Sequence, residues 1–251
     1  HMGGFGSIEG VAAAKAEIIA GLRPEGIAIL NADDARAAAM AELAPARVLT
    51  FSARGRQADL RAENVDLDAA ARAAFDLHLP GLAEPCRVQL AVAGVHNVSN
   101  ALAAAGLALA AGIAPELIAE RLGSVSIESP HRMDISELSG DLLLIDDSYN
   151  ANIDSMTAAL AVLPALAGER RRVVVISEML ELGESSAADH ARTGELAAQA
   201  GAAMLIGIGS TQEALEAAGA RGVEVVGFDD AATAISQIDA LLCDGDAVLV
   251  K

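Results

Sequence analysis

The densest group of side chains that could do chemistry follows a short apolar segment in the second half of the chain. Asp146 and Asp147 come directly after Leu142-Leu143-Leu144-Ile145. Two adjacent carboxylates at the end of a strand can accept hydrogen bonds from ribose hydroxyls or hold Mg²⁺ through water, because Mg²⁺ prefers oxygen ligands. Further polar side chains that could contact a ligand follow at Tyr149, Asn150 and Asn152.

A structural explanation of the same segment is an Asx-rich loop in which Asp154 or Ser155 caps the next helix. That explanation accounts for the end of the segment. It leaves the paired aspartates and the tyrosine unexplained, so we favour a binding site.

Three other positions are weaker candidates. Asn97 and Asn100 are three residues apart, so on a helix both carboxamides lie on one face, where they could bind an adenine edge. Helix capping by Asn97 is the simpler explanation. Lys15 lies in an Ala-rich segment and is expected to be a solvated surface lysine. Arg132 follows a Ser/Pro-containing stretch and could contact a phosphate with two hydrogen bonds, or be an ordinary surface arginine.

Two phosphate-binding motifs are absent from the sequence. It contains neither G-x-x-x-x-G-K-[ST] nor a G-x-G-x-x-G after a strand. Both motifs use backbone N–H groups of a glycine-rich loop to hold phosphates. These 251 residues therefore show no recognisable triphosphate cradle.

Composition narrows the class of partner. Lys and Arg number 17 against 35 Asp and Glu, which gives a formal net charge of −18. Nucleic acids and anionic membranes attract clustered basic residues, so we expect neither as a partner. No apolar run reaches the roughly 18 residues of a membrane span, so we expect no membrane insertion. Cys86 and Cys243 match no disulfide or metal spacing, which favours a reducing, cytoplasmic location.

The elements that must position these residues are those of an α/β protein. In the first half, Ser7 can cap a helix from about 8 to 20, and a strand at 26–30, a helix from about 35 to 43 and a strand at 47–51 follow it. Between 59 and 93 the pattern changes to the alternation of half-exposed antiparallel strands. A shift to Ser, Glu and Pro near 126 marks a domain boundary. Beyond it, strands alternate with helices, among them strands at 142–145, 204–208 and 247–250 and a helix from 155 to 163. We predict a doubly wound sheet that binds ligands at the carboxyl ends of its strands. The predicted domains are residues 1–126 and 127–251.

Taken together, these motifs resemble the Mur ligase family, and most closely its members that add D-Ala-D-Ala. The resemblance covers essentially the whole chain. It rests most specifically on Asp146-Asp147-Ser148-Tyr149-Asn150-Ala151-Asn152. It also includes Glu181-Leu182-Gly183 with His190, Gly94 to Ala101, Ala14 to Ile18, and Leu30 to Asp34. The fold it implies is part of a central domain with a mixed sheet, followed by a Rossmann-like C-terminal domain.

The resemblance implies an ATP-dependent ligase of peptidoglycan synthesis that uses Mg²⁺ and joins D-Ala-D-Ala to a UDP-muramoyl peptide through an acyl phosphate. By similarity, Asn97 and Asn100 would contact adenine, Asp146 and Asp147 the ribose side, and Arg132 the phosphates. Lys15 would be a carbamylated lysine, and it and His1 would bind Mg²⁺. The residues expected on the D-Ala-D-Ala side are Tyr149, Asn150 and Asn152. The whole enzyme is expected to be monomeric.

The sequence departs from the family pattern in several places. We expect it to be a piece that lacks the sugar-binding domain, the phosphate loop and the end of the C-terminal domain, and to be inactive alone. Ile153 replaces the usual proline, and Ser177-Glu178-Met179 replaces Gly-Asp-Met, which puts the role of Glu178 in doubt. The alternatives are a sister Mur ligase or folylpolyglutamate-type ligase, and a noncatalytic nucleotide-binding module.

Overall fold

The computed structural model describes residues 7–125 and 129–251. The chain divides into two compact units, His1–Ser126 and Ile127–Lys251, and each is described by itself.

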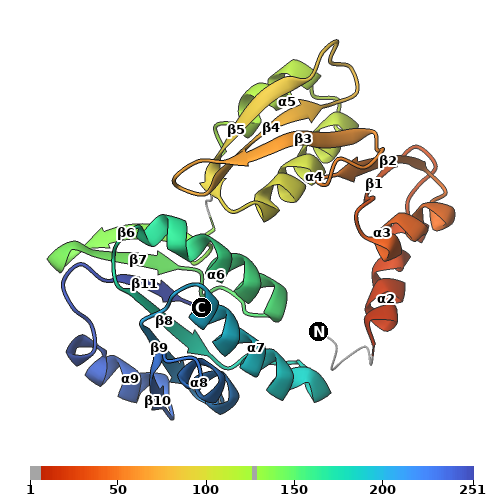
Figure 1. The fold of residues 1–251 in the computed structure, drawn as a ribbon. Helices are drawn as coiled ribbons and strands as arrows, with labels where there is room; N and C mark the ends of the chain where they lie inside the picture. Colours follow the sequence, from red (N-terminus) through yellow and green to blue (C-terminus); the bar gives the residue numbers. More distant parts are fainter. Residues whose placement is uncertain (1–6, 126–128) are drawn as a thin grey trace. The chain divides into compact units, whose positions relative to one another are not determined.

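The first unit is built on a mixed five-stranded sheet with the order β1-β2-β3-β4-β5 (Figure 1). Strands β1, β2 and β3 run parallel, whereas β4 is antiparallel to both β3 and β5. The mixed sheet predicted for this half is confirmed. Its strands are β1 (Ile27–Asn31), β2 (Arg47–Ser52), β3 (Leu60–Leu67), β4 (Arg72–His78) and β5 (Cys86–Ala93).

Two helices cover the core of this sheet. Helix α4 (His96–Ala110) and helix α5 (Pro115–Leu122) pack their apolar side chains against buried residues such as Phe75 and Leu60. Helix α2 (Ile8–Ala20) begins at the cap Ser7, whose hydroxyl accepts a hydrogen bond from the Gly10 N–H, as the sequence predicted. Helix α2 buries none of its residues.

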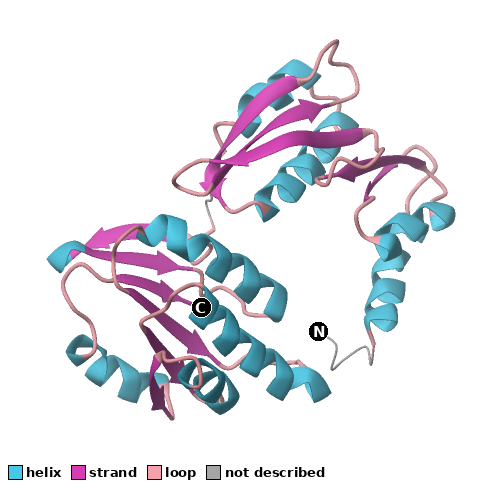
Figure 2. Cartoon of the chain, in the orientation of Figure 1, coloured by secondary structure: helices cyan, strands magenta, loops and turns pink. Residues whose placement is uncertain are grey.

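The second unit contains a six-stranded sheet with the order β10-β9-β8-β11-β7-β6 (Figure 1). Figure 2 shows its strands in magenta and the helices beside them in cyan. All its strands are parallel except β6, which pairs antiparallel with β7 at the edge. Since β11 lies between β7 and β8, the last strand is central. The strands are β6 (Asp134–Leu138), β7 (Leu142–Asp146), β8 (Arg172–Ser177), β9 (Met204–Ile208), β10 (Glu224–Phe228) and β11 (Ala247–Val250).

Helices lie on both faces of this sheet, so the predicted doubly wound arrangement is confirmed. Helices α6 (Ile153–Ala167), α7 (Ser186–Gln199) and α8 (Gln212–Gly219) contribute to one core. On the other face, Ile238 and Leu241, which follow α9 (Ala231–Gln237), pack against Val173 and Val248.

Three features differ from the sequence prediction. Strand β6 was not predicted, because all five of its residues are exposed and carry no alternation of buried and exposed side chains. The predicted helix from 35 to 43 is a short helix α3 (Ala35–Ala39) followed by a 3-10 turn, Met40–Leu43. Helix α6 begins at Ile153, two residues earlier than expected.

The sheet of the second unit brings the candidate segments to one edge. Strands β7, β8 and β11 are parallel neighbours, so the residues that follow each of them emerge at the same carboxyl edge. Those residues are the loop from 147 to 152, the segment from 178 to 183, and Lys251.

Candidate functional site

Asp147 connects three segments at the carboxyl edge of the second sheet. Its N–H donates to the carbonyl of Val250 on β11 at 2.9 Å. One carboxylate oxygen, Oδ1, accepts a hydrogen bond from the Met133 N–H at 3.1 Å, and Oδ2 receives the Lys251 ammonium at 2.5 Å. Both oxygens therefore have partners within the protein, and the Asp147 side chain is only 16% exposed.

Lys251 is the buried cation of this edge. Its side chain is 3% exposed, and its ammonium also donates to the backbone carbonyl of Asn150 at 3.1 Å. A buried charge is costly unless it is paired and hydrogen-bonded, and these contacts meet that requirement. Lys251 therefore holds the loop that follows β7.

Asp146, the neighbouring carboxylate, is paired separately. His131 Nδ1 lies 2.7 Å from its Oδ2, and Oδ1 accepts hydrogen bonds from the Ser148 hydroxyl at 2.6 Å and the Ser148 N–H at 3.1 Å. Burial raises the pKa of this carboxyl, but the hydrogen bonds from Ser148 and His131 outweigh it, so the pKa lies below its ordinary value. Asp146 is thus held in its ionised form.

Arg132 is placed against the same loop. Its guanidinium carbon lies 4.0 Å from the centre of the Tyr149 ring, a cation–π contact. The Tyr149 N–H donates to the carbonyl of His131 at 3.0 Å, which ties the two segments together. His131 and Met133, on either side of Arg132, adopt positive φ angles of 63° and 54°. These conformations are uncommon for residues other than glycine, and they fix the direction in which the Arg132 side chain leaves the backbone.

The two asparagines of the loop differ in their contacts. Asn152 caps α6: its side chain accepts a hydrogen bond from the Ser155 N–H, and the Ser155 hydroxyl accepts one from the Asn152 N–H. The alternative structural explanation therefore named the wrong cap, Asp154 or Ser155, since Ser155 is the third residue of the helix and completes a capping box. Asn150 is exposed, and its side-chain oxygen accepts the Ala151 N–H at 2.8 Å.

A histidine holds the segment after β8. His190 is 3% exposed, its Nδ1 donates to the Ser186 carbonyl at 2.8 Å, and its Nε2 accepts the Met179 N–H at 3.0 Å. Both ring nitrogens are therefore engaged by backbone, which makes His190 a structural clamp. The neighbouring Glu178 is exposed at the same sheet edge.

The first unit carries the two asparagines predicted to bind adenine, Asn97 and Asn100. The Asn97 amide donates to the Ala93 carbonyl at 2.7 Å, and its oxygen accepts the Asn100 amide at 3.0 Å. Val95 is the cap of α4, so the simpler explanation of Asn97 as a helix cap is wrong. Asn100 is exposed and keeps its own side-chain oxygen available to a ligand.

The described residues do not test the predicted metal ligands, Lys15 and His1. Lys15 is exposed on α2, and His1 lies outside the residues that the structure describes. Over residues 7–125 and 129–251, no group of three His, Cys, Asp or Glu side chains is arranged to hold a metal ion.

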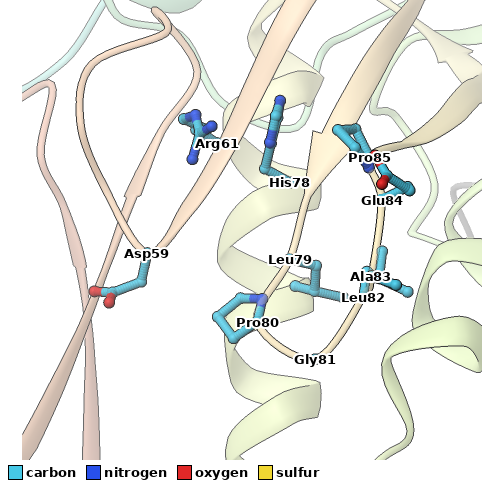
Figure 3. A pocket seen from close by; sticks show the side chains of 10 residues that line it. All are labelled: Asp59, Arg61, His78, Leu79, Pro80, Gly81, Leu82, Ala83, Glu84 and Pro85. Carbon is cyan, nitrogen blue, oxygen red and sulfur yellow. The ribbon is translucent and has the colours of Figure 1, made fainter.

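The first unit also contains a hollow of about 240 Å³, which is lined by residues between 59 and 85 and by none of the predicted site residues. Figure 3 shows Arg61 and His78 on neighbouring strands above the Pro80–Gly81 turn. Glu63 pairs with both, at 2.8 Å to Arg61 Nε and 3.0 Å to His78 Nε2, and the Arg61 hydrogen bond lowers the pKa of Glu63. Since the basic groups are already paired, this hollow offers no free cation for a phosphate.

Sequence reasoning missed three contributors to the site: Lys251, His131 and the N–H of Met133. Lys251 could have been noticed in the sequence, because it ends an apolar strand and the sequence contains only one other lysine, Lys15. The role of a backbone N–H cannot be read from the residue type.

Comparison with known proteins gives matches along both units. Residues 1–108 match the Mur ligase middle domain, and residues 131–251 match the Mur ligase glutamate ligase domain. The UDP-N-acetylmuramoyl-tripeptide:D-alanyl-D-alanine ligases of Mycobacterium tuberculosis H37Rv and Escherichia coli K12 are 38% and 36% identical. These matches cover 100% of this chain, which spans about half the length of these relatives, 53% and 54%.

Solved structures agree with the sequence matches. A crystal structure of MurF from Acinetobacter baumannii is 31% identical with a TM-score of 0.82, over 100% of this chain and 54% of that one. MurF ligase from Thermotoga maritima, solved in complex with ADP, shares the fold with a TM-score of 0.73 at 21% identity, over 98% and 54%.

The matches to known proteins cover both units, including the loop from 147 to 152 and the sheet that carries it. Within residues 7–125 and 129–251, no helix combines the length and apolar character that crossing a membrane requires. The chain is homologous over its whole length to D-alanyl-D-alanine-adding ligases, and it belongs to the Mur ligase family.

Proposed function

We propose that this chain is the middle and C-terminal part of an ATP-dependent ligase that adds D-Ala-D-Ala to a UDP-muramoyl tripeptide in peptidoglycan synthesis. The observation that carries the proposal is the loop from Asp146 to Asn152, fixed at the carboxyl edge of a doubly wound sheet with Arg132 against it. Homology along the whole chain to ligases of that name supports the same reaction.

The proposed reaction has two steps. The terminal carboxylate of the tripeptide attacks the γ-phosphorus of ATP, which releases ADP and forms an acyl phosphate. The amine of D-Ala-D-Ala then attacks the acyl carbon, loses a proton and displaces inorganic phosphate. Transfer of the phosphoryl group depends on positioning and charge stabilisation, which an arginine can supply.

Each unit contributes residues to the proposed binding functions. In the first unit, Asn97 and Asn100 bind the adenine edge. In the second, Asp147 faces the ribose and Arg132 the phosphates. Tyr149, Asn150 and Asn152 face the dipeptide.

Magnesium enters this proposal with the nucleotide. Mg²⁺ usually binds through substrate phosphates and one or two carboxylates, and the described residues form no cage for it. Lys15, if carbamylated, and His1 remain proposed ligands, and no step is assigned to them. We further propose that the whole enzyme is cytoplasmic and monomeric.

Calorimetry with ADP and Mg²⁺ tests the nucleotide part of the proposal. We expect weak binding to the 251-residue chain that is lost in Arg132→Ala and retained in Arg221→Ala. Arg221 is a suitable control because it is a surface arginine of the same unit, paired with Glu195 at 2.7 Å. Inosine diphosphate should bind more weakly than ADP, because its base lacks the amino group that the asparagine carboxamides would recognise.

Absence of ADP binding would contradict the proposed nucleotide site. Equal binding by ADP and inosine diphosphate would contradict adenine recognition by Asn97 and Asn100. Equal ADP binding by Arg132→Ala and the parent would contradict the proposed contact of Arg132 with the phosphates.

A further inference from the structure

Lysine is rare in this chain, and one of its two lysines is buried. The sequence contains 15 arginines but only Lys15 and Lys251. Lys15 is exposed, whereas Lys251 is 5% exposed at the end of the central strand β11. A lysine ammonium is a compact group with three donors, so it fits a small buried space that an arginine fork would overfill.

Among residues 7–125 and 129–251, the acceptors of the Lys251 ammonium all lie in the loop after β7. They are Asp147 Oδ2 at 2.5 Å, the Asn150 carbonyl at 3.1 Å and the Asp147 carbonyl at 3.4 Å. The side chain is too buried and too fully bonded to reach a ligand. Lys251 therefore makes its direct contacts with the loop and none with a ligand.

The effect of Lys251 extends to Arg132 through Asp147. The second oxygen of Asp147 accepts the N–H of Met133, the residue directly after Arg132. Met133 has a φ of 54°, a conformation that needs support from its surroundings for a residue other than glycine. The path from cation to arginine is thus one ion pair, one hydrogen bond and one peptide unit.

We propose that Lys251 is a positioning residue: through Asp147 it fixes the backbone that presents Arg132 and the loop that presents Tyr149. It contacts neither nucleotide nor dipeptide. The consequence for ligand binding rests on the proposed function, whereas the positioning itself does not.

Amide hydrogen exchange tests the positioning directly. In Lys251→Met, Asp147 loses the hydrogen bond from the ammonium, and a hydrogen bond to a charged group is worth about 1.5 kcal/mol or more. Local opening of this segment should then be about tenfold more frequent, so we expect the Met133 and Tyr149 amides to exchange about tenfold faster. The amides of β8 should keep their parental rates. Because the chain has one tyrosine and no tryptophan, its intrinsic fluorescence reports on Tyr149 alone and should also change.

Arg171→Met is the matched control. Arg171 pairs with the buried Asp246 at 3.5 Å, and these two residues adjoin the amino ends of β8 and β11. Its loss should lower stability without changing the Met133 exchange rate or the Tyr149 fluorescence.

A double variant guards against a failure of Lys251→Met to fold. Asp147→Asn with Lys251→Met removes both charges, so no lone charge stays buried. It should fold and also show accelerated Met133 exchange. Parental exchange rates at Met133 and Tyr149 in a folded variant of either kind would overturn the proposal.

An ADP titration separates this proposal from the proposed function. If the parent binds ADP, Lys251→Met should bind it several-fold more weakly. If the parent does not bind ADP but Met133 exchange still accelerates, the nucleotide function fails and the positioning role stands.

Discussion

At the carboxyl edge of the second sheet, the contribution of Asp146 to stability depends on pH. The pKa of Asp146 is lowered in the folded state, so this carboxylate stabilises the fold above its unfolded pKa. That contribution is lost as the pH falls through the lower, folded pKa. The acid limb of the stability curve below about pH 4 should therefore include Asp146.

Asp146→Asn is the variant that tests this dependence. We expect it to lower the free energy of unfolding by about 1 kcal/mol at neutral pH, because the hydrogen bonds to a charged acceptor are lost. The difference from the parent should shrink as the pH falls below 4. Urea unfolding at several pH values measures it, and a difference that stays constant with pH would contradict the pairing.

At this scale the sequence predicted the residue types better than their contacts. Asp146, Asp147 and Tyr149 were singled out because they follow a strand, and the structure places Asp146 and Asp147 at the sheet edge with Tyr149 in the loop beyond. Their partners Lys251 and His131 are 104 and 15 residues away from Asp147 and Asp146. Such contacts depend on strand order, which residue spacing does not give. The ligand roles of these residues remain predictions.

At the scale of elements, helix α6 depends on its cap. Asn152→Ala should lower the free energy of unfolding by about 1 kcal/mol, because it leaves the Ser155 N–H without its acceptor. Asn152→Ser keeps an N-cap oxygen and should retain most of the stability. Chemical denaturation compares the two, and equal losses would show that the cap does not stabilise α6.

Helices α7 and α8 approach closely at Gly194. A Cβ at Gly194 would lie 2.0 Å from the Ala214 carbonyl oxygen, so the helices would have to separate. Gly194→Ala should lower stability by about 3 kcal/mol. Gly219→Ala, whose Cβ would meet only Val225 at 3.7 Å, should stay within about 0.5 kcal/mol of the parent. Equal stability of the two variants in thermal unfolding would contradict this packing.

Most elements could be predicted from their residue patterns: helices from helical periodicity, and buried strands from short continuous apolar runs. Helix α2 and strands β9 and β11 begin and end where the sequence placed them. Strand β6 could not be found, because none of its side chains is buried and only pairing with β7 defines it. The position of β11 between β7 and β8 is equally a tertiary feature, and it is what brings Lys251 to Asp147.

For the whole molecule, the central question is how much of a ligase these 251 residues provide. The sequence has no glycine-rich phosphate loop, so we expect no phosphate release from ATP in the presence of UDP-tripeptide and D-Ala-D-Ala. A phosphate assay measures this. Release at an enzymatic rate that disappears in Arg132→Ala would contradict the expectation.

The most direct test is an NMR titration of the chain with D-Ala-D-Ala in the presence of ADP and Mg²⁺. Tyr149 is the only tyrosine, so its ring signals can be assigned without ambiguity and report on the proposed dipeptide side of the loop. We expect saturable shifts with D-Ala-D-Ala, and none with L-Ala-L-Ala, D-Glu or diaminopimelate. No shift with D-Ala-D-Ala, or equal shifts with the other compounds, would contradict a D-alanyl-D-alanine-adding ligase.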